Sequence, residues 1–578
     1  MSIPQSASSA STSAIAGRVL DTRPQLLGHP VGLFLLFMVE MWERFSYYGM
    51  RALLVLYLTS PLTGMRKPPS GALPGFNPGP GWPDADASTL YGWYTGLAYL
   101  FPVLGGIIAD RLLGTHRSML VGGVLIMAGH IALAVSGMGS FHAQPIGETI
   151  FIGGLPLIVL GTGHFKPSVS VMVGQLYAKD DPRRDGAFSI FYMGINLGAF
   201  LCAFVCGTLG ERVGWHWGFG SAAVGMFLGL VMYMVGRPIY LKGIGERTPK
   251  ETPDGIGPGP EAHSRLAAGA TRSALVFLVL GAVLSCLFAA AFHYQLLGEV
   301  NRLMTAPVII ALAVVIFALA VWFVAIQRPE DRGPVASIFI FMGFNAFFWL
   351  AFEQAGSSMT LFADRYTDAH IAGPNSWSMP TTWFQSVNPA IIFLFAPVFS
   401  LLWTALGKRR MNPSQPVKIG LGLILLGVGF VVLVLGARGV HVVPPPAGAP
   451  PEELGVVTAK ASLWFLMGAY FFHTMGELCL SPTGLSYVTK AAPARFVSLL
   501  MGIWFISSFI ANLTGGLIAA QTERIEKGEI KLPWNVSEGT GTIQADFFLL
   551  FVVTSIGAGV VILVLTPLLK KLMRNPAD

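Results

Sequence analysis

Long apolar runs recur from one end of the chain to the other, separated by short segments rich in Gly, Pro and charged residues. Each run holds about 20 residues, the length that lets a helix cross the hydrocarbon core of a bilayer. The pattern therefore predicts an all-α integral membrane protein with fourteen transmembrane helices. We expect these helices at about residues 28–59, 88–110, 117–138, 148–177, 186–208, 217–240, 271–293, 303–328, 332–364, 378–407, 416–436, 459–489, 495–520 and 544–569.

The order of the runs divides the chain into two halves. Six runs precede the segment KGIGERTPKETPDGIGPGPEAHSR, and six follow a further pair of runs that we expect to be peripheral scaffold. Gly, Pro and charge mark the segment as a linker, and two six-helix halves around a central cavity are the expected layout. The predicted parts are a cytoplasmic N-terminal tail (1–27), an N-terminal six-helix bundle (28–240), a cytoplasmic linker (241–270), two additional helices (271–328), a C-terminal six-helix bundle (332–570) and a cytoplasmic tail (571–578).

Composition and charge support this interpretation and set an orientation. The chain is 53% hydrophobic and 12% charged, against roughly 25% charged residues in a soluble domain. With the N-terminus placed in the cytoplasm, the inward tails and loops hold 23 of the 37 Lys and Arg residues and the outward loops hold nine, in line with the positive-inside rule. The net charge of +7 follows from this topology, so no nucleic-acid partner is expected. We expect the protein in the cell inner (plasma) membrane, with both termini cytoplasmic.

Several motifs are missing from the sequence. Residues 1–27 lack a basic start followed by a short apolar core and a cleavage site, so the first helix is expected to be retained. The four cysteines fall within predicted helices and suggest neither a disulfide framework nor a metal site. The Gly-Lys pair at 407–408 is followed by Arg409, which excludes a Walker A motif, and no HExxH occurs. No metal or other cofactor is expected, and a proton is the candidate energy source.

The first predicted helix contains the polar stretch EMWERFSYYGMR at residues 40–51. At about 100° per residue its polar side chains fall on one face, over some 16 Å of the helix axis. A charge at the bilayer centre costs at least about 2.5 kcal/mol, so this face must look at protein or water. An internal ion-pair lattice is the alternative to a functional role. The residues on this face are Glu40, Glu43, Arg44, Tyr47, Tyr48 and Arg51.

Three other helices add isolated ionisable residues at similar depth: Lys166 in GTGHFKPSVSVMVGQ, Glu353 in FFWLAFEQAGSS and Glu477 in FFHTMGELCLSPTGLS. Gly, Pro or Ser lies beside each, which lets a ligand approach the helix backbone. The membrane interior then holds four acids and three bases. One carboxylate lacks a basic partner, and such a group in a low-dielectric site takes up a proton. The sequence therefore points to a proton-binding site.

Together these motifs resemble those of proton-coupled oligopeptide transporters of the major facilitator superfamily, over nearly the whole chain. EMWERFSYYGMR is similar to the family's ExxERFxYY element, GGIIADRLLGTHR (105–117) to the superfamily motif between helices 2 and 3, and FYMGINLGAF (191–200) to the helix 5 signature. FKPSVS, FWLAFEQAGS, WFQSVNP and GELCLSP resemble parts of helices 4, 7, 8 and 10. The resemblance implies the major facilitator fold, with an inserted helix pair as in prokaryotic members. It also implies a symporter, not an enzyme, that imports di- and tripeptides by alternating access.

The resemblance implies roles for individual residues. Candidate ion pairs are Arg51 with Glu353 towards the outside and Lys166 with Glu477 towards the inside. Asp110 is expected to cap a neighbouring helix end or pair with a base and so to lock the outward-open form, while the small residues of its motif let helices 2 and 11 approach. The implied assignments are Arg51 and Lys166 to the peptide carboxylate, Asn196, Asn388 and Glu477 to the peptide amino group, Tyr47, Tyr48, Tyr94, Trp349, Trp504 and Ser508 to the pocket, Glu40, Glu43, Arg44 and Glu353 to proton coupling, and Asp110 and Arg111 to gating.

Helix 2 lacks the histidine that animal members carry there, so coupling is expected to rest on carboxylates, with His164 and His473 as packing residues. The expected partners are di- and tripeptides, protons and the lipid bilayer, and a monomer is the expected functional unit. Two alternatives stay open. The same fold could carry another small solute, such as nitrate, another anion or a drug-like peptide mimetic. A membrane enzyme such as an intramembrane protease would need a nucleophile beside a base, and no spacing indicates one.

Overall fold

The computed structural model describes residues 24–60, 79–141, 144–178, 181–246, 260–294, 306–371, 373, 376–443, 456–493 and 496–573. Most of the predicted N-terminal tail (1–27), part of the linker (241–270) and most of the C-terminal tail (571–578) lie outside the described residues. Nearly all regular structure within them is helical, as predicted.

The helices follow the order expected from the sequence. The first half contains α2 (Val31–Thr59), α3 (Asp84–Ile108), η1 (Ala109–Leu113), α4 (Thr115–Ser136), α5 (Pro145–Gln175), α6 (Arg184–Cys202), η3 (Ala203–Gly207), α7 (Thr208–Arg212) and α8 (Trp215–Tyr240). The inserted pair is α9 (Pro260–His293) and α11 (Ala306–Ala325). The second half contains α12 (Pro329–Phe352), η4 (Glu353–Gly356), α13 (Ser358–Tyr366), η5 (Thr381–Ser386), α14 (Val387–Lys408), α15 (Gln415–Arg438), α16 (Leu463–Ala491), α17 (Val497–Ala519), α18 (Thr522–Glu526) and α19 (Gln544–Met573).

Eleven helices among the described residues are long and apolar enough to cross a membrane. The polar α2, together with α11 and α16, completes the fourteen predicted spans. The linker was expected to run to residue 270; α9 already begins at Pro260, and its stretch long and apolar enough to cross a membrane begins at Ala268. Proline is compatible with the first turn of a helix, and the Ala, Leu and Arg residues that follow favour helix.

Short strands, which the sequence did not predict, occur between the helices. They are β1 (Gln25–Leu26) with β2 (His29–Pro30), β3 (Thr367–Asp368) with β6 (Ala461–Ser462), and β4 (His441–Val443) with β5 (Val456–Ala459). Each sheet has only two strands. They are therefore minor additions to an all-α fold.

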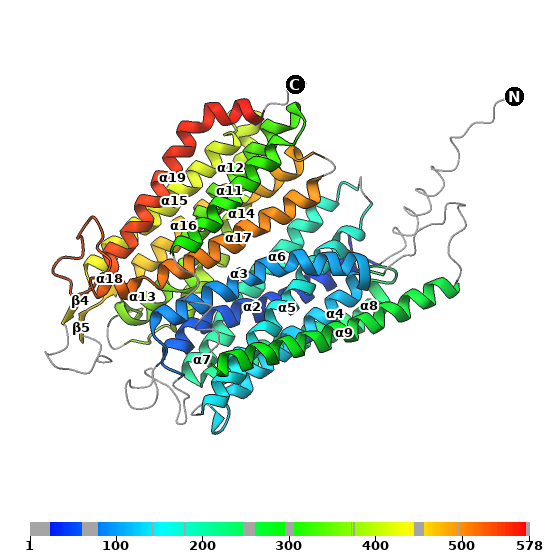
Figure 1. The fold of residues 1–578 in the computed structure, drawn as a ribbon, viewed down its shortest axis with the longest axis horizontal. Helices are drawn as coiled ribbons and strands as arrows, with labels where there is room; N and C mark the ends of the chain where they lie inside the picture. The colour runs from blue at the N-terminus through cyan, green and yellow to red at the C-terminus, as the bar shows by residue number, and fades with distance from the viewer. Residues whose placement is uncertain are drawn as a thin grey trace.

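Two helix bundles make up the molecule, α2 to α8 in one and α12 to α19 in the other (Figure 1). The two inserted helices contact different bundles: α9 packs on α4 and α5 of the first bundle, whereas α11 contacts α12 of the second. We call the side where α2 begins and α19 ends the terminal face. The opposite side, where α13 ends and β4 and β5 lie, is the loop face.

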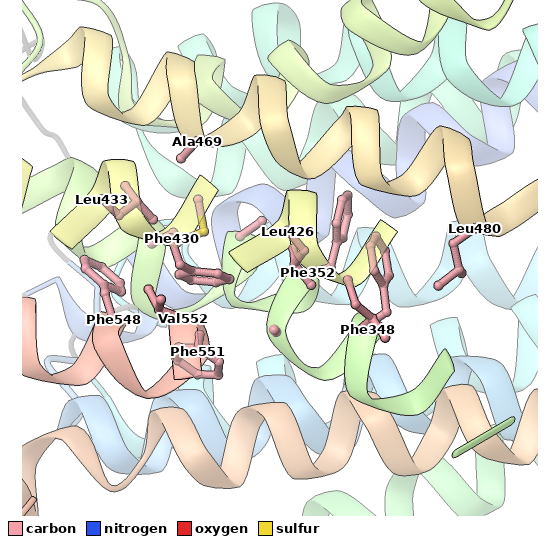
Figure 2. Close-up of a cluster of buried hydrophobic side chains, with 14 of the residues drawn as sticks. Phe348, Phe352, Leu426, Phe430, Leu433, Ala469, Leu480, Phe548, Phe551 and Val552 are labelled. Atoms are coloured by element: carbon pink, nitrogen blue, oxygen red, sulfur yellow. The ribbon is translucent and has the colours of Figure 1, made fainter. Parts of the chain in front are cut away.

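Phenylalanine side chains fill the core of the second bundle, between α12, α15 and α19 (Figure 2). The Phe430 and Phe551 rings stack with centroids 5.0 Å apart, and those of Phe348 and Phe352 stack at 5.6 Å. Lipid tails are as apolar as these side chains, so close packing, not the exclusion of water, is what favours helix association inside a bilayer. Interlocked aromatic rings supply that packing and give the second bundle a rigid interior.

Glycines let the two bundles meet along α3 and α17. A Cβ atom on Gly516 would lie 2.6 Å from the Cα atom of Gly92 and 2.6 Å from the carbonyl oxygen of Ser88. In a numbering that leaves out the inserted pair, α3 and α17 are helices 2 and 11, and the sequence prediction assigned their close approach to the small residues of the motif at 105–117. That assignment was wrong for Gly105, whose added Cβ would lie 2.0 Å from the carbonyl oxygen of Gly163 in α5, within its own bundle.

Replacing Gly516 by alanine is expected to destabilise the closed loop face. The new methyl group meets backbone atoms that cannot rotate away, and overpacking of this kind costs typically about 1–3 kcal/mol. We expect a lower thermal midpoint and slower transport than in the wild type. Gly557→Ala is the matched control, because a Cβ there meets no atom within 4 Å. Equal thermal midpoints for the two variants would contradict the packing argument.

Candidate functional site

The polar face of α2 begins with two carboxylates that share one guanidinium. Arg44 Nε donates to Glu40 Oε1 over 2.7 Å and lies 3.1 Å from Glu43 Oε2. All three side chains are buried, Glu43 completely. Neither oxygen of the Glu43 carboxylate accepts a hydrogen bond from the described residues. The only ion-pair partner of the buried Glu43 carboxylate among the described residues is therefore the Arg44 guanidinium, which it shares with Glu40.

About two turns further along the same face, Arg51 joins the two bundles. Its guanidinium forms an ion pair with Glu353 of η4, and its Nε donates to the hydroxyl oxygen of Tyr91 in α3 over 2.7 Å. Arg51 and Glu353 are 7% and 3% exposed, so the pair is sealed from solvent. The pair that the resemblance implied is thus present. Charges so placed are costly to separate unless each finds another partner.

Further contacts between the bundles close the loop face. Arg365 of α13 donates to both carboxylate oxygens of Asp84 in α3, over 2.5 and 2.6 Å. The carboxylate of Glu211 in α7 accepts hydrogen bonds from the backbone N–H groups of Thr381 and Thr382 in η5, each over 2.8 Å. With the Arg51 pair, these contacts tie three regions of the first bundle to the second on the loop side. The loop face is therefore the closed side.

Lys166 of α5 has a different partner from the one expected. Its Nζ atom lies 4.4 Å from the centroid of the Tyr99 ring in α3, a cation–π contact. Among the described residues it forms no ion pair, so the pairing of Lys166 with Glu477 expected towards the inside is absent from this structure. An ammonium group that rests only against an aromatic face can still receive a carboxylate, because the ring supplies no full negative charge.

Glu477 of α16 belongs to a separate polar group. Asn388 Nδ2, from α14, donates to Glu477 Oε2 and to Thr474 Oγ1, each over 2.9 Å. Asn196, the third residue implied for an amino group, donates its amide to the Tyr192 carbonyl oxygen of its own helix over 3.0 Å. The structure thus brings Asn388 and Glu477 into direct contact.

Aromatic side chains line a cavity of about 160 Å³ beside these groups. Trp349 Nε1 donates to Asn345 Oδ1 over 3.2 Å, which fixes the indole ring against the cavity wall. Of the implied pocket residues, Trp349, Trp504 and Ser508 share this wall. The lining residues are Tyr99, Asn345, Trp349, Trp504, Phe505, Ser508 and Asn512.

The tyrosines of α2 and α3 form a second aromatic group. The rings of Tyr47 and Tyr48 meet edge to face at 5.3 Å, and Tyr47 stacks on Tyr94 at 6.4 Å. The guanidinium of Arg51 lies 5.8 Å from the Tyr48 ring. Tyr48 also lies within electrostatic range of Glu353 in η4 and Glu477 in α16. The polar face of α2 therefore looks into a space shared with the second bundle.

The implied gating residues Asp110 and Arg111 lie exposed on η1, a π-helical turn after α3. Asp110 makes no ion pair with any described residue, so the expected cap or base partner is absent in this structure. His164 and Ser118 are hydrogen-bonded, Nδ1 to Oγ, at 3.1 Å, and the buried His473 ring lies 4.6 Å from that of Phe430. Both rings are packed against other side chains, and their role as packing residues stays a prediction.

Sequence reasoning missed four residues of this site. Tyr91, Tyr99, Asn345 and Thr474 each contact a residue that it did assign. A signal existed for Tyr91, because the 100° period places it about 60° from the assigned Tyr94 on the same helix, whereas Tyr99 falls about 140° away and had no such signal. Asn345 and Thr474 had a weaker one, lying four residues before Trp349 and three before Glu477.

The chemistry of the site is that of charge recognition. Within the described residues no group of three or more His, Cys, Asp or Glu side chains could hold a metal ion. Two cations, Arg51 and Lys166, come from the first bundle, whereas the acceptors Asn388 and Glu477 come from the second. Such an arrangement suits a ligand with a negative end and a positive end.

Comparison with known proteins agrees with this geometry. Residues 116–534 match the model of the POT family. The chain is 37% identical over 500 residues to the peptide transporter YePEPT of Yersinia enterocolitica, covering 86% of this chain and 88% of that protein. It is 33% identical over 556 residues to the di-/tripeptide transporter of Lactococcus lactis subsp. cremoris, covering 96% and 98%.

Solved structures show the same likeness. A crystal structure of the peptide transporter POT in complex with sulfate matches with a TM-score of 0.69 and 34% identity, covering 96% of this chain and 99% of that one. A POT family transporter in complex with a thioalcohol-conjugated peptide matches with a TM-score of 0.69 and 26% identity, covering 95% and 99%. The relatives are transporters, which removes the membrane-enzyme alternative. This multi-pass membrane protein belongs to the POT family of transporters.

Proposed function

We propose that the protein is a proton-coupled symporter that imports di- and tripeptides by alternating access. The observation that carries the proposal is the separation of charge in the site, with Lys166 and Arg51 on one bundle and Asn388 and Glu477 on the other. A short peptide is a zwitterion whose ends are alike in every sequence. The two cations would hold the peptide carboxylate. The acceptors, together with Asn196, would hold the peptide amino group. The names of the relatives above, peptide and di-/tripeptide transporters, support this substrate class.

Charge balance on α2 and α5 supplies a physical route to proton coupling. Lys166 interacts electrostatically with Glu40, Glu43 and Arg44, and these four groups sum to zero when all are ionised. A peptide carboxylate docking on Lys166 adds one negative charge to this buried set. Burying an uncompensated charge is costly, so a proton on Glu43, whose oxygens accept no hydrogen bond from the described residues, restores neutrality. Peptide and proton would therefore bind together.

The orientation follows from the basic residues on the terminal face, which include Lys408, Lys570 and Lys571 at the ends of α14 and α19. Placing that face in the cytoplasm satisfies the positive-inside rule. The sealed loop face then faces outward, so the structure is the inward-facing state of a transporter in the inner membrane. We further propose that a single chain is the functional unit, because each bundle contributes groups to the site.

A proton can drive substantial accumulation. One charge crossing about 100 mV yields about 2.3 kcal/mol, and one pH unit adds about 1.4 kcal/mol. Together these sustain a roughly 400-fold gradient of a neutral solute. Purified protein in proteoliposomes is therefore expected to concentrate dialanine when a proton gradient is imposed, and to release it when the gradient is collapsed. Dialanine accumulation that is equal with and without the proton gradient would contradict symport.

The second candidate is another small solute on the same fold. A drug-like peptide mimetic that keeps both charged ends fits the same site, whereas a bare anion such as nitrate leaves the acceptor groups Asn388 and Glu477 without a donor. We expect unlabelled trialanine to compete with dialanine uptake and nitrate to leave it unchanged. Competition by nitrate alone would favour the anion alternative.

A further inference from the structure

Thr474 of α16 touches the proposed amino-end group without being part of it. The side chain is completely buried, at 0% exposure. Its hydroxyl donates to the Tyr470 carbonyl oxygen over 2.6 Å, and its oxygen accepts from Asn388 Nδ2 over 2.9 Å. A hydroxyl has a single proton to donate. Because that proton is committed to Tyr470, the Thr474 oxygen can offer Asn388 only an acceptor.

The amide of Asn388 is thereby placed in one orientation. An asparagine side chain carries two donors on nitrogen and an acceptor on oxygen, and a flip of the amide exchanges them. Both protein neighbours, Thr474 Oγ1 and Glu477 Oε2, are acceptors for the nitrogen. The flipped amide would set its oxygen against both of them, leaving three acceptors without a donor. The Asn388 nitrogen must therefore point at the protein, and Oδ1 away from it.

Two acceptor atoms are then presented to a ligand. Neither Asn388 Oδ1 nor Glu477 Oε1 accepts a hydrogen bond from the described residues. Neither is among the completely buried atoms without a partner, so neither is sealed inside the protein. An ammonium group has three N–H donors and no acceptor, so it fits this pair. An N-acylated terminus has one N–H and adds a carbonyl oxygen. That oxygen is an acceptor and would face the two acceptor atoms of the site.

We propose that Thr474 is a positioning residue that fixes the Asn388 amide and so makes the site selective for a free α-ammonium group. The inference rests on the proposed function, since it concerns the amino end of a peptide substrate. Thr474 acts through Asn388 and does not touch the substrate. Its removal is expected to weaken binding more than turnover.

The test is uptake of dialanine and of N-acetyl-dialanine by full-length variants in proteoliposomes. Thr474→Val keeps the shape but removes the hydroxyl, so the KM for dialanine should rise about tenfold with kcat within about twofold, a change of about 1.4 kcal/mol in binding. The preference for dialanine over its N-acetyl form should fall by a similar factor. Thr474→Ser, which restores the hydroxyl, should recover both, and Thr474→Ala should repeat the loss if the valine variant folds poorly.

The matched control is Thr566→Val in α19. Thr566 is buried and its hydroxyl donates to the Ile562 carbonyl oxygen over 2.9 Å, the same local bond, but it contacts no residue of the site. It should leave KM and the preference unchanged. If dialanine uptake is normal and Thr474→Val behaves like this control, the inference is overturned while the proposed function stands. If the wild type fails to take up dialanine, the proposed function is overturned and this inference with it.

Discussion

Replacing Lys166 by alanine is expected to reduce proton-driven uptake of dialanine at least about 100-fold. A hydrogen bond between charged groups contributes about 1.5–3 kcal/mol, and a buried carboxylate left without its partner costs about 3–5 kcal/mol. Lys166 forms no ion pair with the described residues and rests on the Tyr99 ring, so the expected loss is that of the substrate contact, not of a structural bridge. Initial rates in proteoliposomes at several dialanine concentrations measure the effect.

Lys418 provides a matched control within the same chain. Lys418 is a buried lysine, 8% exposed, whose Nζ atom, like that of Lys166, lies 4.4 Å from an aromatic centroid, that of Trp403. It lies in α15, within the second bundle, and forms no ion pair with any described residue of the site. Lys418→Ala should keep most of the uptake. Retained accumulation in the Lys166 variant, or equal losses in both, would remove Lys166 from the substrate site.

The fold was predictable because its signal is local. A run of about 20 apolar residues is sufficient to predict a membrane span, and the observed helices begin and end within a few residues of most predictions. The start of α9 was missed because helix propensity there outweighs the Gly and Pro residues upstream. The short strands were missed because two-residue pairings depend on where distant loops meet.

The site was predictable only in part. Motif resemblance gave its residues one at a time, and helical periodicity placed six of them on one face of α2. Neither reveals which residues touch across the bundles. Tyr91 beside Arg51 and Tyr99 beside Lys166 depend on how α3 packs against α2 and α5.

Two expected contacts depend on the state of the transporter. A transporter changes partners between states, and the sequence prediction placed the Lys166–Glu477 pair towards the inside and the Asp110 contact in the outward-open form. Their absence here agrees with the inward-facing state proposed above, so both contacts stay predictions for the other state.

Replacing Glu353 by glutamine is expected to uncouple transport from the proton gradient. Glu353 holds Arg51 across the two bundles in a sealed ion pair. Besides the Glu43 route, we propose that a proton must neutralise Glu353 before Arg51 can turn to the peptide. Glutamine is neutral at all times, so Arg51 is released without a proton. The accumulation ratio of dialanine should fall to about one, since a gradient that moves no protons does no work, while counterflow exchange between the two sides continues.

Asp84→Asn tests whether the loss is specific to this ion pair. The Asp84–Arg365 pair also joins the bundles on the loop face, but its side chains are 30% and 14% exposed. A half-buried ion pair is screened by water more than a sealed one, and asparagine can still accept one of the two hydrogen bonds, so this variant should accumulate dialanine within about twofold of the wild type. Equal loss of accumulation and counterflow in Glu353→Gln would make Glu353 a structural residue. If both variants keep counterflow and only Glu353→Gln loses accumulation, proton coupling lies at the Arg51 pair.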